Sequence, residues 1–162
     1  MIPFQMRPDE ILAEARGFNE KLAKGVGNLM EVGDIPSGVT PKEPVYKEDK
    51  LVLYRFKGKK PATNKTPLLI VYALVNRPYM TDLQENRSTI QGLLEAGQDV
   101  YLIDWGYPDA ADRYLTLDDY INGYLDRCID VICARHGIDK LNLLGICQGG
   151  SFSLCYSAMH PE

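Results

Sequence analysis

The chain has 162 residues, of which 45% are hydrophobic, and a formal net charge of −4 at pH 7. This length and composition suffice for one globular domain with a buried core. The acidic balance and the lack of a basic block give no indication of nucleic-acid binding. We also expect no signal peptide and no transmembrane segment, since no basic leader precedes an apolar stretch and no apolar run approaches ~20 residues. The expected location is the cytoplasm.

An amphipathic helix is predicted over Pro8 to Met30, because apolar residues recur there at alternating steps of three and four. These residues are Ile11, Ala15, Phe18, Leu22, Val26 and Leu29. A stretch rich in proline and glycine follows as far as Pro44 and predicts a loop. We therefore expect an N-terminal helix and loop over residues 1–44. Residues 45–162 should form the first part of the main, catalytic domain. The apolar stripe could pack on that domain or on a partner.

The main domain begins with two short segments, Val45 to Tyr46 and Leu51 to Phe56, that are typical of antiparallel strands. Three mostly apolar runs follow, at residues 68–74, 99–104 and 140–144. Their length and composition indicate buried parallel strands.

Helical patterns separate these three runs. The sequence Thr-Asp-Leu-Gln at residues 81–84 predicts a capping box, before a helix around residues 88–95 that Gly97 can end. A second helix is predicted to begin at a cap formed by Thr116 and Asp119. Its expected apolar face consists of Leu117, Ile121, Tyr124, Cys128 and Ile132. The alternation of strands and helices predicts an α/β fold, with a mostly parallel sheet and helices on both faces.

The most informative motif is Gly-Ile-Cys-Gln-Gly-Gly at residues 145–150, between the last predicted strand and a helix-like run. Strand, sharp turn and helix in this order indicate a nucleophile elbow, with Cys147 as the nucleophile in place of a serine. Gly145, Gly149 and Gly150 are the expected elbow glycines, and at Gly145 and Gly149, two residues from Cys147, side chains would clash. Together with the preceding elements, the elbow predicts the α/β-hydrolase fold and a catalytic Cys147.

Two backbone amides are expected to form an oxyanion hole. One is the Gln148 N–H, at the start of the elbow helix. The other should come from the loop after the first parallel strand, where the Val75 N–H is the first candidate and the Asn76 N–H the second. The alternative is that this loop is an ordinary connection, stiffened by Pro78.

Other polar and aromatic residues follow the strands at the same edge of the sheet, where α/β folds bind ligands. Trp105 could line an acyl pocket, or it could pack under a loop while Asp104 binds a backbone amide. Arg77 could meet a phosphate of a nucleotide-bearing substrate, or it could be solvated or paired with an aspartate.

The other three cysteines, Cys128, Cys133 and Cys155, lie in predicted helices. Their spacings match neither zinc motifs nor a disulfide-rich scaffold, so we expect three buried, reduced thiols. We expect no metal site and no cofactor.

A cysteine nucleophile normally needs a histidine base and an acid that orients it, and in this fold both follow the nucleophile in the chain. Neither histidine present fits. His136 should lie at the amino edge of the sheet, and His160 should lie about 20 Å from Cys147 along the elbow helix, at ~1.5 Å per residue. We therefore expect this chain to be the front part of a longer protein, inactive by itself, with the acid and the base beyond residue 162.

Three segments together resemble the catalytic subunit of class III polyhydroxyalkanoate synthases: residues 67–79, residues 99–109 and the elbow at residues 145–150. The resemblance extends over about residues 45–162. It implies an acyltransferase that polymerises 3-hydroxyacyl-CoA, such as 3-hydroxybutyryl-CoA, through a covalent thioester on Cys147. It also implies contact with the growing polyester, a second noncatalytic synthase subunit, homo-oligomerisation and association with polyhydroxyalkanoate granules.

Two other interpretations remain open. A cysteine α/β-hydrolase of the dienelactone hydrolase or thioesterase type would have a similar elbow. A noncatalytic granule-associated or subunit-docking module would use the N-terminal helix and keep the elbow only for packing.

Overall fold

The computed structural model describes residues 8–31 and 37–161. Contacts within the chain divide it into two units, residues 1–35 and 36–162. In the first unit, α1 spans Pro8–Glu31 and confirms the predicted helix, with Asp9 and Glu10 in its first turn, where the helix dipole favours negative charge. Residues 32–36 of the predicted loop lie outside the described residues. No helix in the described ranges has both the length and the hydrophobicity that crossing a bilayer requires.

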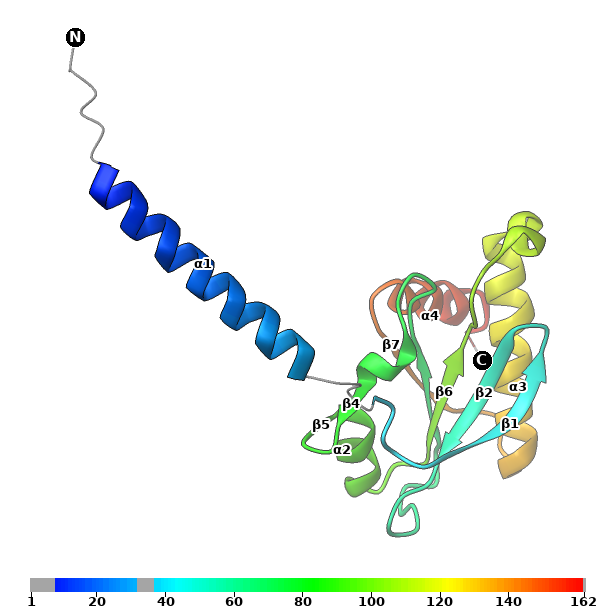
Figure 1. The fold of residues 1–162 in the computed structure, drawn as a ribbon. Coiled ribbons are helices and arrows are strands. Elements are labelled where there is room, and N and C mark those ends of the chain that lie inside the picture. Colours follow the sequence, from blue (N-terminus) through cyan, green and yellow to red (C-terminus); the bar gives the residue numbers. More distant parts are fainter. Residues whose placement is uncertain (1–7, 32–36, 162) are drawn as a thin grey trace. The chain divides into compact units, whose positions relative to one another are not determined.

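The second unit is built around a five-stranded sheet of order β1-β2-β6-β3-β7 (Figure 1). Its strands are β1 (Lys42–Glu48), β2 (Leu51–Phe56), β3 (Leu68–Val71), β6 (Val100–Asp104) and β7 (Asn142–Gly145). β1 and β2 form an antiparallel pair, and β2 continues antiparallel to β6. β3 lies between β6 and β7 and is parallel to both. The predicted order of strands is confirmed, although β1 begins at Lys42 rather than at Val45.

Helices cover both faces of this sheet. Side chains of α3 (Asp126–His136) and α4 (Gln148–Met159) pack on one face with Leu69 and Val71 of β3. Ile90 of α2 (Thr89–Glu95) packs on the other face with Ile70. Successive residues of β3 thus enter opposite cores, as the alternation of side chains along a strand requires. This arrangement confirms the predicted α/β architecture.

The connection between β3 and α2 differs from the prediction. Pro78–Thr81 form a 3₁₀ turn, η1, and a small two-stranded sheet of β4 (Asp82–Gln84) and β5 (Arg87–Ser88) follows. The buried carboxylate of Asp82 accepts hydrogen bonds from the Thr40 N–H at 2.8 Å, the Thr40 hydroxyl at 2.7 Å and the Ser88 hydroxyl at 2.6 Å. The predicted capping box is therefore wrong, and Ser88 caps α2 instead, by accepting a bond from the Gln91 N–H at 3.0 Å.

The connection between β6 and β7 contains a 3₁₀ turn, η2 (Ala110–Tyr114), and a π-helical segment, η3 (Asp119–Leu125), that continues into α3. The predicted cap is confirmed, because Asp119 Oδ2 accepts bonds from the Thr116 N–H at 2.7 Å and the Thr116 hydroxyl at 2.8 Å. Leu117 is exposed, so its predicted place on the apolar face is wrong. It precedes the wide π-helical turns, whose spacing departs from the 3.6-residue period on which the prediction relied.

Candidate active site

Cys147 occupies a sharp turn between β7 and α4. The turn is fixed to the neighbouring strand by a bond from the Ile146 N–H to the Val71 carbonyl at 2.9 Å. Cys147 has φ 57° and ψ −126°, a conformation that residues with a side chain rarely adopt, and the residue is exposed. Such strain persists only where the surrounding structure enforces it, and it is concentrated at functional sites.

The glycines around this turn differ in how closely other atoms approach them. A Cβ on Gly149 would overlap the Val71 carbonyl oxygen, and a Cβ on Gly145 would overlap the Cα of Gly150. A Cβ on Gly150 would instead lie 3.5 Å from the Gly145 carbonyl oxygen, which is an ordinary contact. The close approach of strand and helix therefore depends on Gly145 and Gly149, whereas Gly150 has room for a methyl group.

The loop after β3 approaches the elbow through its backbone. The Leu74 N–H donates a hydrogen bond of 3.2 Å to the side-chain Oε1 of Gln148, the residue that follows Cys147. This bond occupies the Leu74 amide, and the next two amides in the loop belong to Val75 and Asn76, the predicted oxyanion donors. No motif or spacing indicates this contact, because it joins a backbone amide to a side chain from a distant part of the chain.

Arg77 ties the same loop to the segment after β6. Its Nη1 donates a bond of 3.2 Å to the Gly106 carbonyl, and its guanidinium group stacks on the Tyr107 ring. Arg77 is half-buried and contacts a carbonyl and an aromatic ring, so it is neither fully solvated nor paired with an aspartate, and the contact with a substrate phosphate stays a prediction. Arg77 therefore connects two loops at the carboxyl edge of the sheet.

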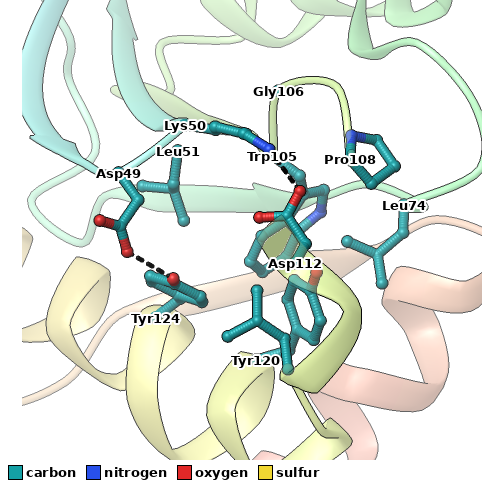
Figure 2. Close-up of a pocket in the computed structure, with 11 residues that line it drawn as sticks. Asp49, Lys50, Leu51, Leu74, Trp105, Gly106, Pro108, Asp112, Tyr120 and Tyr124 are labelled. Carbon is teal, nitrogen blue, oxygen red and sulfur yellow. Dashed lines mark hydrogen bonds and ion pairs between the residues drawn. The ribbon is translucent and has the colours of Figure 1, made fainter. Parts of the chain in front are cut away.

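Trp105 is partly buried against the core cluster that contains Phe152, and it also lines a cavity of about 110 Å³ (Figure 2). Its indole N–H donates to the Tyr72 carbonyl at 2.9 Å, and its ring meets those of Tyr120 and Phe152 edge-on. Asp104, as predicted for one alternative, accepts a bond from a backbone amide, that of Gly106, at 3.0 Å. Trp105 is thus held in one orientation by contacts on several sides.

The polar groups around this cavity are paired with each other. The Lys50 ammonium group lies 2.8 Å from an Asp109 oxygen and also binds Asp112, and these hydrogen bonds raise the pKa of Lys50. The Tyr124 hydroxyl donates to Asp49 at 2.6 Å, which, together with burial, raises the pKa of Tyr124 to about 12. Figure 2 shows the Lys50–Asp112 and Tyr124–Asp49 pairs beside the apolar side chains. The apolar part of the cavity wall includes Leu51, Leu74, Trp105 and Leu115. The cavity is therefore suited to an apolar group.

The four cysteines are free thiols with different exposures. Cys128 is buried and Cys133 half-buried, but Cys155 is exposed, so the prediction of three buried thiols is wrong for Cys155. The buried face of α4 carries Gly149, Phe152 and Ser153. Cys155 lies outside that stripe and faces away from the sheet.

The exposure of the thiols predicts their reactivity. Burial raises the pKa of Cys128 to about 12, so at pH 8 this thiol is protonated as well as shielded. We expect iodoacetamide to modify Cys147 in the native protein and to modify Cys128 only after denaturation. Peptide mass spectrometry over a time course measures both rates, and equal native rates for Cys128 and Cys147 would contradict the structure.

Neither histidine lies beside the elbow. His136 is at the amino end of β6, where its Nε2 is 2.8 Å from the Tyr101 hydroxyl and 3.4 Å from Asp99 Oδ2. His160 follows the last turn of α4 and stacks on Tyr156, with ring centroids 4.3 Å apart. Both positions agree with the sequence-based expectation that neither residue is the base.

Comparisons with known proteins agree with this architecture. A family model described as the alpha/beta hydrolase fold matches residues 66–162. The chain is 63% identical over its full length to the poly(3-hydroxyalkanoate) polymerase subunit PhaC of Allochromatium vinosum, of which it covers 46%. It is 54% identical to the subunit of the same name from Synechocystis, of which it covers 44%.

A more distant relative extends the same relationship. The PhaC subunit of Cupriavidus necator is 33% identical over 87% of this chain, which covers 26% of that protein. The chain thus spans less than half the length of these curated relatives. Full-length identity above 50%, on an α/β-hydrolase scaffold with a cysteine at the elbow, makes this chain a member of the poly(3-hydroxyalkanoate) polymerase PhaC family.

Proposed function

We propose that the full-length protein is a class III polyhydroxyalkanoate synthase and that this chain supplies its nucleophile. The observation that carries the proposal is the exposed Cys147 in a strained conformation, φ 57°, at the elbow between β7 and α4. The strained turn exposes the sulfur at the edge of the sheet. Acyl transfer requires such exposure, because the sulfur must reach a carbonyl carbon of the substrate. The names of the relatives support the polymerase class.

In the first step, the Cys147 sulfur attacks the thioester carbonyl of a 3-hydroxyacyl-CoA. The bond between this carbon and the CoA sulfur breaks, CoA leaves as a thiol, and the acyl group becomes a thioester on Cys147. One thioester replaces another, so the acyl-enzyme keeps the reactivity that a serine ester would lose. The N–H groups of Gln148 and of Val75 or Asn76 are the proposed donors to the oxyanion.

In the second step, the hydroxyl oxygen of another 3-hydroxyacyl group attacks the thioester on Cys147. A new ester bond lengthens the chain, the sulfur of Cys147 is released, and the proton of the hydroxyl passes to a general base. His136 and His160 lie elsewhere, so we propose that a histidine oriented by an acid, both from the remainder of the full-length protein, serves as the base. Water must be kept out, because hydrolysis of the same thioester would give free acid.

We further propose that the substrate is short-chain and that its apolar part enters the cavity beside Trp105. A cavity of about 110 Å³ is small beside the ~300–1,000 Å³ of most ligand pockets, which favours a small apolar group. Leu74 connects the cavity with the elbow, because its side chain lines the cavity and its amide binds Gln148. A 3-hydroxybutyryl group matches this size.

The proposed setting is the one that class III synthases imply: a cytoplasmic enzyme on polyhydroxyalkanoate granules that works with a second, noncatalytic subunit and forms oligomers. The apolar stripe of α1, with Phe18 and Leu22, is a candidate for contact with such partners.

Product analysis tests the proposed reaction. The full-length protein, together with its noncatalytic subunit, should convert 3-hydroxybutyryl-CoA into CoA and insoluble polyester. Release of CoA with free 3-hydroxybutyrate and no polymer would support a thioesterase or dienelactone-type hydrolase. No CoA release and no preferential labelling of Cys147 over Cys155 would support a docking module.

A further inference from the structure

The Gln148 side chain bridges the two segments from which the oxyanion donors are proposed to come. Gln148 is the first residue of α4, and its own N–H is one proposed donor. Its side-chain Oε1 accepts the 3.2 Å bond from the Leu74 N–H, and Leu74 immediately precedes Val75, the first candidate for the other donor. One residue therefore contributes its backbone to the elbow and its side chain to the facing loop.

The loop after β3 needs such an anchor, because its side chains give it little support at this point. Val75 is 86% exposed, and Asn76 is exposed with its Oδ1 bonded to the next amide, that of Arg77, at 2.8 Å. The next contact along the chain is made by Arg77, through the Gly106 carbonyl and the Tyr107 ring. Gln148 and Arg77 thus hold the loop on either side of the two candidate donors.

The distance between two oxyanion donors has a large effect on acyl transfer. Removing one donor from such a hole typically lowers the rate ~100- to 1,000-fold, and a displacement of ~1 Å can have a similar effect. A hydrogen bond that contributes little to folding stability can therefore have a large effect on the rate of acyl transfer when it fixes the position of an oxyanion donor.

We propose that Gln148 is a positioning residue, whose side chain holds the Leu74 amide and thereby sets the place of the Val75 and Asn76 amides relative to Cys147. This inference rests on the proposed acyl transfer at Cys147. It adds a second function to Gln148, distinct from the backbone N–H that any residue at this position would supply.

Two substitutions in the full-length protein test the role. Gln148→Met keeps a side chain of similar length and removes the oxygen acceptor, whereas Gln148→Glu keeps an oxygen that can accept the same bond and is compatible with a helix N-terminus. The exposed Gln84 of β4 provides a matched control, Gln84→Met, that should behave as wild type.

Two rates are measured for each variant: CoA release from 3-hydroxybutyryl-CoA and alkylation of Cys147 by iodoacetamide. Alkylation forms no oxyanion, so it reports whether the sulfur is still presented normally. We expect Gln148→Met to lower kcat for CoA release about 10- to 100-fold, with KM and the alkylation rate within about twofold of wild type. Gln148→Glu should recover a substantial part of the lost kcat.

Three results would overturn the inference. They are an unchanged or raised kcat in Gln148→Met, a parallel fall in CoA release and Cys147 alkylation, and a Gln148→Glu variant as slow as Gln148→Met. The proposed function fails in a different way, through polymer formation by a protein that lacks the Cys147 thiol. The two failures are therefore distinguishable.

Discussion

Replacing Cys147 with alanine is expected to lower CoA release from 3-hydroxybutyryl-CoA by at least about a thousandfold in the full-length protein. The substitution removes the sulfur atom that receives the acyl group. CoA could then be released only by direct attack of water on the substrate thioester. The φ of 57° at this position is compatible with a change to alanine, whose Cβ occupies the same place as that of cysteine. The variant should therefore remain folded, and the loss should be chemical.

The readouts for this variant are CoA release, measured with a thiol reagent, and acyl-enzyme formation, measured by mass spectrometry of the intact protein and of its peptides. Wild type should gain the mass of one acyl group on the peptide that contains Cys147, and Cys147→Ala should gain none. Cys155→Ala, at an exposed position on the same helix, is the matched control and should retain wild-type turnover. Polymer formation by Cys147→Ala at a rate near wild type would disprove the nucleophile assignment.

The sheet could be predicted because each of its strands is a short apolar run between clear breaks. Residues 68–71 and 100–103 are buried throughout, as expected for strands covered on both faces. The elbow was predictable for a related reason, since a glycine pair around a cysteine, between a strand and a helix, is typical of this turn and of few others. In both cases, local sequence and global fold demand the same residues.

One kind of error and one missed contact occur where a side chain is used by a distant segment. Asp82 fits a local capping pattern, but its carboxylate binds Thr40, which lies far earlier in the chain. The bond from the Leu74 amide to Gln148 likewise joins residues that are distant in sequence. Periodicity and spacing report on local structure, so contacts of this kind could not be read from one sequence. The role of Cys147 itself remains a prediction that the kinetic experiment must decide.

A second large effect is expected from adding one methyl group next to the elbow. In Gly149→Ala, the new Cβ would overlap the carbonyl oxygen of Val71 and lie 2.5 Å from its carbonyl carbon, and both are backbone atoms of β3, the strand between β6 and β7. The strand and α4 would have to separate, although the Val71 carbonyl also holds the turn through the Ile146 amide. We expect the free energy of unfolding to fall by about 3 kcal/mol or more.

Gly150→Ala is the control that separates this clash from the general effect of placing alanine in a helix. Its Cβ would meet the Gly145 carbonyl oxygen at 3.5 Å, an ordinary contact, and alanine stabilises a helix interior relative to glycine by up to ~1 kcal/mol. Urea titrations of the full-length protein, followed by circular dichroism, should therefore place Gly150→Ala close to or above wild type and Gly149→Ala far below it. Equal midpoints for the two variants would mean that β3 and α4 do not approach as closely as the structure requires.

The strained conformation of Cys147 depends on that close approach, so Gly149→Ala should also slow the alkylation of Cys147 in whatever fraction of the protein still folds.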